Sequence, residues 1–256
     1  MDLLELKVKN RPVYIIDDSK LLGGSKYRAM LPFLKTILKK NKPNYIFFPG
    51  AANGLGMLAL SLAASELKKD YDIQVHIYTQ YYETPIVKLC KTLGSHVHVY
   101  KKKFKDIYKI IDEDKKKVSK YNPIEINLGG DNKEFINIFK KELSKVIKKH
   151  NIKNSSNTHI WVVYGSGTLY KTLIQILDKA IFHLVEVGKK ITYVRKQDKI
   201  YESKMGFYQE PEKEFLPPYD TIKSYDAKIW QFLVKNIDKY EGDTYVWNVG
   251  KEPDEK

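Results

Sequence analysis

One lysine of this chain stands in a setting that could support covalent chemistry. Lys26 follows Gly23-Gly24-Ser25 and precedes Tyr27-Arg28, at the predicted start of a helix. A lysine amine attacks a carbonyl carbon only when it is neutral, and enclosure near a helix start favours that form by lowering its pKa. Most lysines in such a chain are surface residues, so the case for Lys26 depends on the segments that accompany it.

A second segment could bind an anion. Gly165-Ser166-Gly167-Thr168 follows an apolar strand and opens a predicted helix. Backbone N–H groups and hydroxyls at such a turn point at an anion, and the helix dipole adds attraction. The segment lacks the Gly-Lys-Ser/Thr ending of a Walker loop and is not a full dinucleotide fingerprint. A purely structural strand-to-helix turn is the alternative.

A third segment is rich in small residues. Gly50-Ala51-Ala52-Asn53-Gly54-Leu55-Gly56 lies at another predicted strand-to-helix junction. Small side chains allow a flat group to lie against the backbone, and Asn53 could donate a hydrogen bond to a ring oxygen. An asparagine that is merely tolerated in a tight turn is the alternative interpretation.

Hydrophobic periodicity predicts alternating strands and helices, which favours an α/β fold with parallel sheets. We expect strands at 13–16, 44–48, 74–78, 95–100, 160–163, 184–187, 191–194 and 244–248. We expect helices at 26–40, 54–67, 85–93, 105–121, 134–149, 168–177 and 226–237, and a proline-containing loop at 209–219.

The composition bounds the class of protein. With 256 residues, of which 43% are hydrophobic, the chain can form one large or two modest cores. No apolar stretch is long enough to span a bilayer, no signal peptide is recognised at the N-terminus, and no metal-ligand pattern is predicted. A single cysteine, Cys90, excludes an intrachain disulfide. These features favour a cytoplasmic location and no membrane partner.

The net charge of +14 could attract nucleic acid or an anionic cofactor. The densest lysine runs are Lys101-Lys102-Lys103 and Lys115-Lys116-Lys117. Neither run has the glycines or interleaved aromatic residues of a dedicated single-strand binder. Solvated helix faces therefore explain most of the charge, and nucleic acid stays an open partner.

In combination and in order, these segments resemble the fold-type II enzymes that use pyridoxal 5'-phosphate (PLP), the tryptophan synthase β superfamily. The chain is most similar to the 1-aminocyclopropane-1-carboxylate deaminase/D-cysteine desulfhydrase family. The match includes Lys26, Asn53, Gly165-Ser166-Gly167-Thr168 and Ser224-Tyr225-Asp226-Ala227-Lys228, the last resembling a Tyr-Glu-Gly-Lys segment. The resemblance runs over nearly the whole chain, which is shorter than typical members.

The resemblance implies a fold and a set of roles. It implies a shortened, two-lobed, three-layer α/β/α fold, with residues 1–43 and 126–256 in a larger PLP-binding lobe and 44–125 in a smaller one. Lys26 would carry PLP as a Schiff base and act as the acid and base at the substrate. Asn53 would contact the ring, Gly165-Ser166-Gly167-Thr168 would bind the phosphate, and Asp226 would pair with the pyridine nitrogen. Tyr225 would be catalytic or a substrate contact.

The implied function is lyase or deaminase chemistry on a small amino acid or amine, begun by removal of its α-proton. The family's deaminases have a serine where this chain has Ala52, which argues against opening of a cyclopropane ring. Two alternatives remain: a PLP-dependent enzyme that modifies an amino-acid-like group carried on nucleic acid, and a catalytically inactive PLP-binding relative. A homodimer is expected from resemblance alone.

Overall fold

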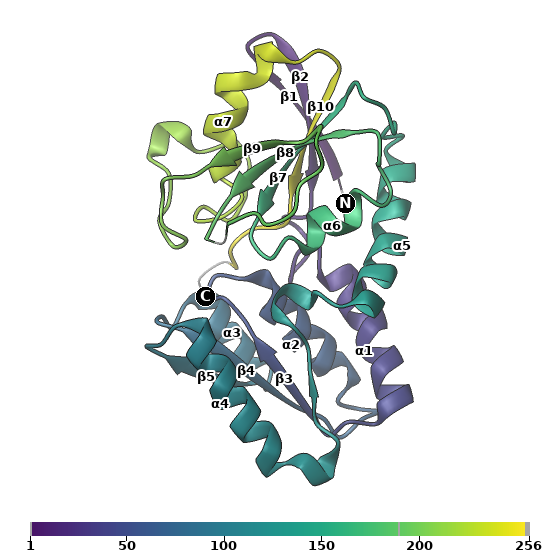
Figure 1. Ribbon diagram of the computed structural model, residues 1–256, viewed down its shortest axis with the longest axis vertical. Coiled ribbons are helices and arrows are strands. Elements are labelled where there is room, and N and C mark those ends of the chain that lie inside the picture. Colours follow the sequence, from purple (N-terminus) through teal and green to yellow (C-terminus); the bar gives the residue numbers. More distant parts are fainter. Residues whose placement is uncertain (1, 189, 254–256) are drawn as a thin grey trace. The chain divides into compact units, whose positions relative to one another are not determined.

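A computed structural model describes residues 2–188 and 190–253, which form two compact units that each contain one β-sheet (Figure 1). Residues 2–21 and 140–252 form what we call the terminal unit, and residues 22–139 form the middle unit. The sequence placed these boundaries at 43/44 and 125/126. They differ chiefly because helix α1 packs along helix α2 and so belongs with the middle unit.

The middle unit is built on a four-stranded parallel sheet in the order β5-β4-β3-β6. Its strands are β3 (Tyr45–Pro49), β4 (Gln74–Gln80), β5 (His96–Tyr100) and β6 (Ile124–Glu125). Its helices are α1 (Tyr27–Asn41), α2 (Leu55–Leu67), α3 (Pro85–Thr92) and α4 (Phe104–Lys117), with short 3-10 helices at Ser119–Tyr121 and Leu128–Gly130.

Alternating side chains of β3 explain why this sheet is covered on both faces. Phe47 packs with Ile107 and Ile111 of α4 on one face. Successive strand residues point to opposite faces, and Phe48 lies beside Gly56 of α2 on the other. Both phenylalanines are buried. The result is a three-layer α/β/α arrangement in the middle unit.

The terminal unit contains a six-stranded sheet in the order β1-β2-β10-β7-β8-β9, parallel except for β1. Its strands are β1 (Asp2–Val8), β2 (Arg11–Asp17), β7 (Thr158–Tyr164), β8 (Ile181–Glu186), β9 (Lys199–Glu202) and β10 (Asp243–Asn248). Its helices are α6 (Thr168–Leu173) and α7 (Lys228–Asn236), with 3-10 helices at Lys213–Phe215 and Ile237–Lys239; α5 (Lys133–Lys149) contributes to both units.

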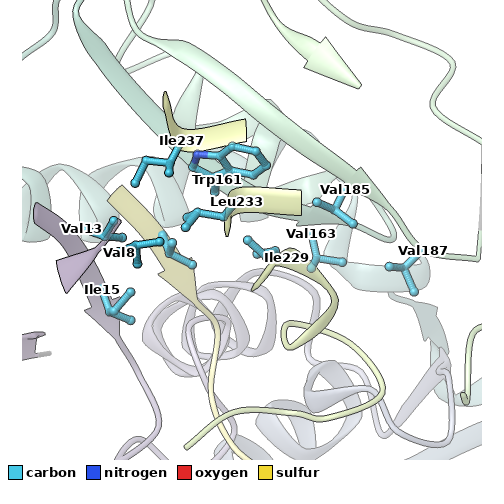
Figure 2. Packing of buried hydrophobic residues seen from close by; sticks show 11 residues of the cluster. Val8, Val13, Ile15, Trp161, Val163, Val185, Val187, Ile229, Leu233 and Ile237 are labelled. Carbon is cyan, nitrogen blue, oxygen red and sulfur yellow. The ribbon is translucent and has the colours of Figure 1, made fainter. Parts of the chain in front are cut away.

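The core of the terminal unit lies between α7 and its sheet. Ile229 and Leu233 of α7 pack on Trp161, Val163 and Val185 of β7 and β8 (Figure 2). Every residue of β7 is buried, as expected for a central strand of a parallel sheet. The prediction of a two-lobed α/β fold with mostly parallel sheets is confirmed. No helix in the described part of the chain is long and apolar enough to cross a membrane.

One predicted strand is wrong. Residues 191–194 are not a strand, although their sequence alternates; Tyr193 and Val194 are exposed. This segment leads instead to Arg195, which donates hydrogen bonds to the carbonyls of Asp178 and Ala180 and to the Asp198 carboxylate. The strand that follows β8 and pairs with it is β9, which begins five residues after this segment ends. Strands β1 and β6 were also not predicted.

Asp198 joins this loop to the core, and its replacement by alanine should destabilise the protein. Its buried carboxylate accepts hydrogen bonds from Arg195, from the Tyr170 hydroxyl at 2.6 Å and from the Phe182 N–H at 2.9 Å. Removing it leaves Arg195 without its charge partner, which should lower the free energy of unfolding by about 3–5 kcal/mol. Urea titration checks this.

The control for this prediction is the Asp2–Lys20 ion pair, whose side chains are both exposed. Because water screens that pair, Asp2→Ala should cause little measurable change in the same titration. Equal effects of the two substitutions would contradict the role assigned to Asp198.

Candidate functional site

Lys26 is placed by close packing between α1 and α2. It directly precedes α1, after Gly23 and Gly24, whose φ angles of 86° and 65° favour glycine. A Cβ at Gly23 would lie only 3.1 Å from the Cα of Ala59 in α2. The turn before α1 therefore approaches α2 closely here because residue 23 has no side chain.

This packing directs the Lys26 amine at the first turn of α2. A Cβ built on Gly56 would be in ordinary van der Waals contact with Lys26, 3.9 Å from its Nζ. Burial lowers the pKa of Lys26 to about 8, and the Asp131 carboxylate opposes the shift. At neutral pH roughly a tenth of the amine is uncharged, far more than for an ordinary lysine. The structure thus gives Lys26 the property that nucleophilic chemistry requires.

The turn that contains Asn53 leads directly into α2. It is held by the Gly54 N–H, which donates to the Ala51 carbonyl at 2.7 Å, and by the Thr84 hydroxyl, which donates to the Ala52 carbonyl at 2.6 Å. Ala52 is completely buried. Lys26 and the Asn53 turn therefore both adjoin the start of α2, and we call them, with Gly56, the Lys26 cluster.

A second group of predicted residues gathers in the terminal unit around Gly165. The Gly165 N–H hydrogen-bonds the Tyr225 hydroxyl, and a Cβ at Gly165 would collide with that hydroxyl and lie 3.0 Å from the ring. The Ser166 and Thr168 hydroxyls are 3.1 Å apart. Gly167 has a φ of 79°, which turns the chain into α6. We call this loop, with Tyr225 and Asp226, the Asp226 cluster.

Asp226 is an unusual carboxylic acid. Its side chain is 1% exposed, and neither oxygen accepts a hydrogen bond of ordinary geometry from any residue in 2–188 or 190–253. Burial raises its pKa well above the ordinary value, and the nearby Val249 N–H offsets part of the rise. By contrast, the buried Asp17 accepts hydrogen bonds from Ser19 and Asn248. Asp226 is therefore suited to a cationic or N–H partner that the described residues do not provide.

Tyr219 is a neighbour of this acid that was not predicted as a site residue. Burial raises its pKa strongly, and the negative charges of Asp226 and Asp17 raise it further. Burial and Asp226 likewise raise the pKa of Tyr225 above the physiological range. Both hydroxyls therefore keep their protons. Tyr219 ends the proline-containing segment that was predicted only as a loop, and nothing in its sequence indicated a neighbouring carboxyl.

Gly165→Ala should destabilise the protein, because the added methyl group must displace the partly buried ring of Tyr225. The expected loss is about 1–3 kcal/mol of unfolding free energy, typical of overpacking. Gly206→Ala is the matched control, since a Cβ there would meet no atom within 4 Å. Chemical denaturation measures both. A Gly165→Ala variant as stable as Gly206→Ala would contradict the contact with Tyr225.

The fold was compared with solved structures. An ACC deaminase homologue has a TM-score of 0.77 at 18% identity, with coverage of 98% of this chain and 89% of that one. A fungal L-serine ammonia-lyase from Rhizomucor miehei has a TM-score of 0.69 at 14% identity, with coverage of 99% and 93%. No family model and no curated protein matches the sequence.

A third similar structure has a bound reaction intermediate. It is the Escherichia coli diaminopropionate ammonia lyase in complex with an aminoacrylate–PLP azomethine, with a TM-score of 0.64 at 11% identity. The match covers 94% of this chain and 80% of that one. At these identities the similarity establishes the fold.

Proposed function

Since the chain has the fold of the fold-type II PLP enzymes, we propose that it binds PLP and acts on a small amino acid by removing its α-proton. The observation that carries the proposal is the buried Asp226 carboxyl, which lacks a hydrogen-bond partner of ordinary geometry in the described chain. A protonated pyridine nitrogen is a flat N–H cation. It would satisfy this carboxyl and favour its ionised form.

Other residues of the two clusters match the remaining groups of the cofactor. The Lys26 amine, with its pKa near 8, would condense with the aldehyde. The Ser166 and Thr168 hydroxyls and the backbone N–H groups of their glycine-rich loop would hold the phosphate. Asn53 would contact the ring oxygen. Each group of PLP thereby has a partner of suitable chemistry in this chain.

PLP, when bound, supplies an electron sink for the electrons left behind by a departing α-proton. The residues of the chain would carry out the proton transfers and provide the negative charge beside the pyridine nitrogen. Lys26 would hold the cofactor and would take the α-proton of the substrate at Nζ, and the protonated amine could then give a proton to the leaving group. An ionised Asp226 would keep the pyridine nitrogen protonated. Tyr225 would act as a proton donor or substrate contact, because its raised pKa keeps the hydroxyl protonated.

Within this class of reactions, we favour elimination or deamination. Ala52 presents a buried methyl group directly before Asn53, so that position offers no hydroxyl for opening a strained ring. An acid at position 226 favours chemistry that begins with loss of the α-proton. Small amino acids with a leaving group on the β-carbon are therefore the first substrates to test.

Reductive trapping tests cofactor binding. Purified protein is incubated with PLP and borohydride, digested, and analysed by mass spectrometry. The proposal predicts one modified lysine, Lys26. Lys228 is the internal control, since burial also lowers its pKa to about 8, but its Nζ donates to the carbonyls of Gly206 and Phe207. Modification mainly at Lys228, or of no single lysine, would contradict the proposal.

A substrate screen tests the reaction class. Protein loaded with PLP is incubated with single amino acids of both configurations, and ammonia and keto acids are measured. Release of both products from a β-substituted amino acid supports elimination. If PLP binds at Lys26 but no amino acid is turned over, the result would contradict the proposed reaction and favour the catalytically inactive, PLP-binding relative.

A further inference from the structure

A basic hollow in the middle unit shares no residue with the Lys26 cluster or the Asp226 cluster. It encloses about 850 Å³ and is lined by Tyr81, Lys101, Lys102, Lys103, Lys105 and Lys109, together with two acidic residues, Asp106 and Glu113. Tyr81 follows β4, the lysine run follows β5, and the remaining lysines lie on α4, which begins at Phe104 (Figure 1). The segments after β4 and β5 and the helix α4 thus contribute to it.

The lysines of this hollow are gathered in one short stretch of the chain, from Lys101 to Lys109. All five are exposed, and none forms an ion pair with any residue that the structure describes. Elsewhere exposed lysines do pair, for example Lys91 with Glu83 and Lys145 with Glu142. Asp106 and Glu113 reduce the positive charge of the hollow without neutralising it. An uncompensated cluster of this kind attracts a polyanion.

The backbone holds the aromatic residue and the lysine run together. The Tyr81 N–H donates to the Tyr100 carbonyl at 3.0 Å, and the Gln80 side chain donates to the Lys102 carbonyl at 2.7 Å. Tyr81 has a φ of 61°, an unfavourable value for a bulky residue, yet its side chain remains 42% exposed. These bonds fix an accessible ring beside several unpaired ammonium groups.

We propose that this hollow binds single-stranded nucleic acid, with the lysines on successive phosphates and a base stacked on Tyr81. Phosphate contacts from lysine and stacking on an exposed aromatic side chain are the two components of such sites. The sequence separates them, because Tyr81 is twenty residues before the lysine run, and the fold of β4 and β5 brings them together. The proposal is independent of any PLP chemistry.

The test measures binding of a fluorescent oligothymidylate of about 12 nucleotides by anisotropy, at several salt concentrations from about 50 mM upward. The hollow variant Lys102→Ala/Lys103→Ala/Lys105→Ala is compared with the control Lys35→Ala/Lys39→Ala/Lys40→Ala. The control lysines are also exposed, lie in the same unit and form no ion pair in the described chain. Both triple variants lose the same net charge.

We expect the hollow variant to bind about tenfold or more weakly than wild type, and the control less than about threefold more weakly. The slope of log affinity against log salt should fall by about 2 in the hollow variant alone. Tyr81→Leu should weaken binding at least about fivefold, whereas Tyr193→Leu, which removes an exposed tyrosine of the terminal unit, should not.

Three results would overturn the proposal. One is the absence of binding at the lowest salt concentration. Another is an equal loss in the hollow and control variants, which would indicate diffuse attraction to a basic protein. The third is equal affinity for a duplex of the same length, whose stacked bases cannot reach Tyr81.

Discussion

Replacing Lys26 by alanine should abolish both the visible absorbance of the PLP-loaded protein and its turnover of amino acids. The amine is the group that condenses with the aldehyde, and no other side chain of the Lys26 cluster can form that bond. Activity should fall by about 10³-fold or more, as for loss of a covalent catalyst that is also the acid and base. Stability should change little or rise, since the substitution removes a partly desolvated amine.

The conservative variant is Lys26→Arg, which keeps a positive charge but loses the nucleophile. It should fail in the same assays, which separates nucleophilic attack from simple charge attraction. Spectra are recorded with added PLP, and unfolding is followed by circular dichroism. A Lys26→Ala protein that keeps the absorbance band and turnover would show that another residue carries the cofactor.

Comparison of Lys26 with Lys228 shows why a lowered pKa alone does not identify a catalytic lysine. Burial lowers both pKa values to about 8. The Lys228 ammonium is held by two backbone carbonyls and so has a structural task, fastening the segment around Gly206 and Phe207. The Lys26 Nζ instead lies beside Gly56 in the first turn of α2, next to the Asn53 turn. The neighbouring segments therefore distinguish the two lysines.

Sequence patterns predicted the strands and helices wherever both faces are buried, because burial imposes the periodicity. They failed at the edge strands β1, β6 and β9, although the edge strand β5 was predicted. Residues 191–194 alternate like a strand, but Arg195 and Asp198 fix that region as a loop, and the exposed edge strand β9 has little hydrophobic signal. The predicted clusters depended similarly on visible patterns. Gly165 belongs to a glycine-rich turn that is visible in the sequence. Its contact with Tyr225, sixty residues later, is visible only in the folded structure.

The lysine run illustrates the same limit for binding surfaces. In sequence, Lys101-Lys102-Lys103 is flanked by Tyr100 and Phe104, and both of these side chains pack against the buried cluster around Phe47. Parallel pairing of β4 with β5 brings the residues after both strands to one edge of the sheet, and this places Tyr81 in the hollow. Local sequence cannot predict such a pairing, since it depends on which strands become neighbours.

Asp226→Asn should lower turnover while making the cofactor-free protein more stable. With PLP bound, an amide at this position cannot keep the pyridine nitrogen protonated, and loss of that electrostatic support should cost about 10²- to 10³-fold in turnover. Without PLP, the wild-type carboxyl is buried without a hydrogen bond of ordinary geometry, and its ionisation is costly. The asparagine variant removes that cost.

The pH dependence of stability follows from the direction of the shift. The folded-state pKa of Asp226 lies well above the ordinary value of 3.8. Its contribution to stability is therefore fully present below that value and is lost as the pH rises through the folded-state pKa. Relative to wild type, Asp226→Asn should gain about 1.4 kcal/mol per pH unit across this window, reaching a plateau above it.

Urea unfolding of the cofactor-free proteins, from acidic to mildly alkaline pH, measures this difference. Asp17→Asn is the matched control, because the buried Asp17 carboxylate accepts hydrogen bonds from Ser19 and Asn248. An asparagine has only one side-chain oxygen to accept them, so this substitution should lower the free energy of unfolding. Saturating PLP should remove the advantage of Asp226→Asn, since the pyridine nitrogen then offsets the cost of the carboxylate. If the difference in unfolding free energy between Asp226→Asn and wild type changed with neither pH nor PLP, Asp226 would be a packing residue only.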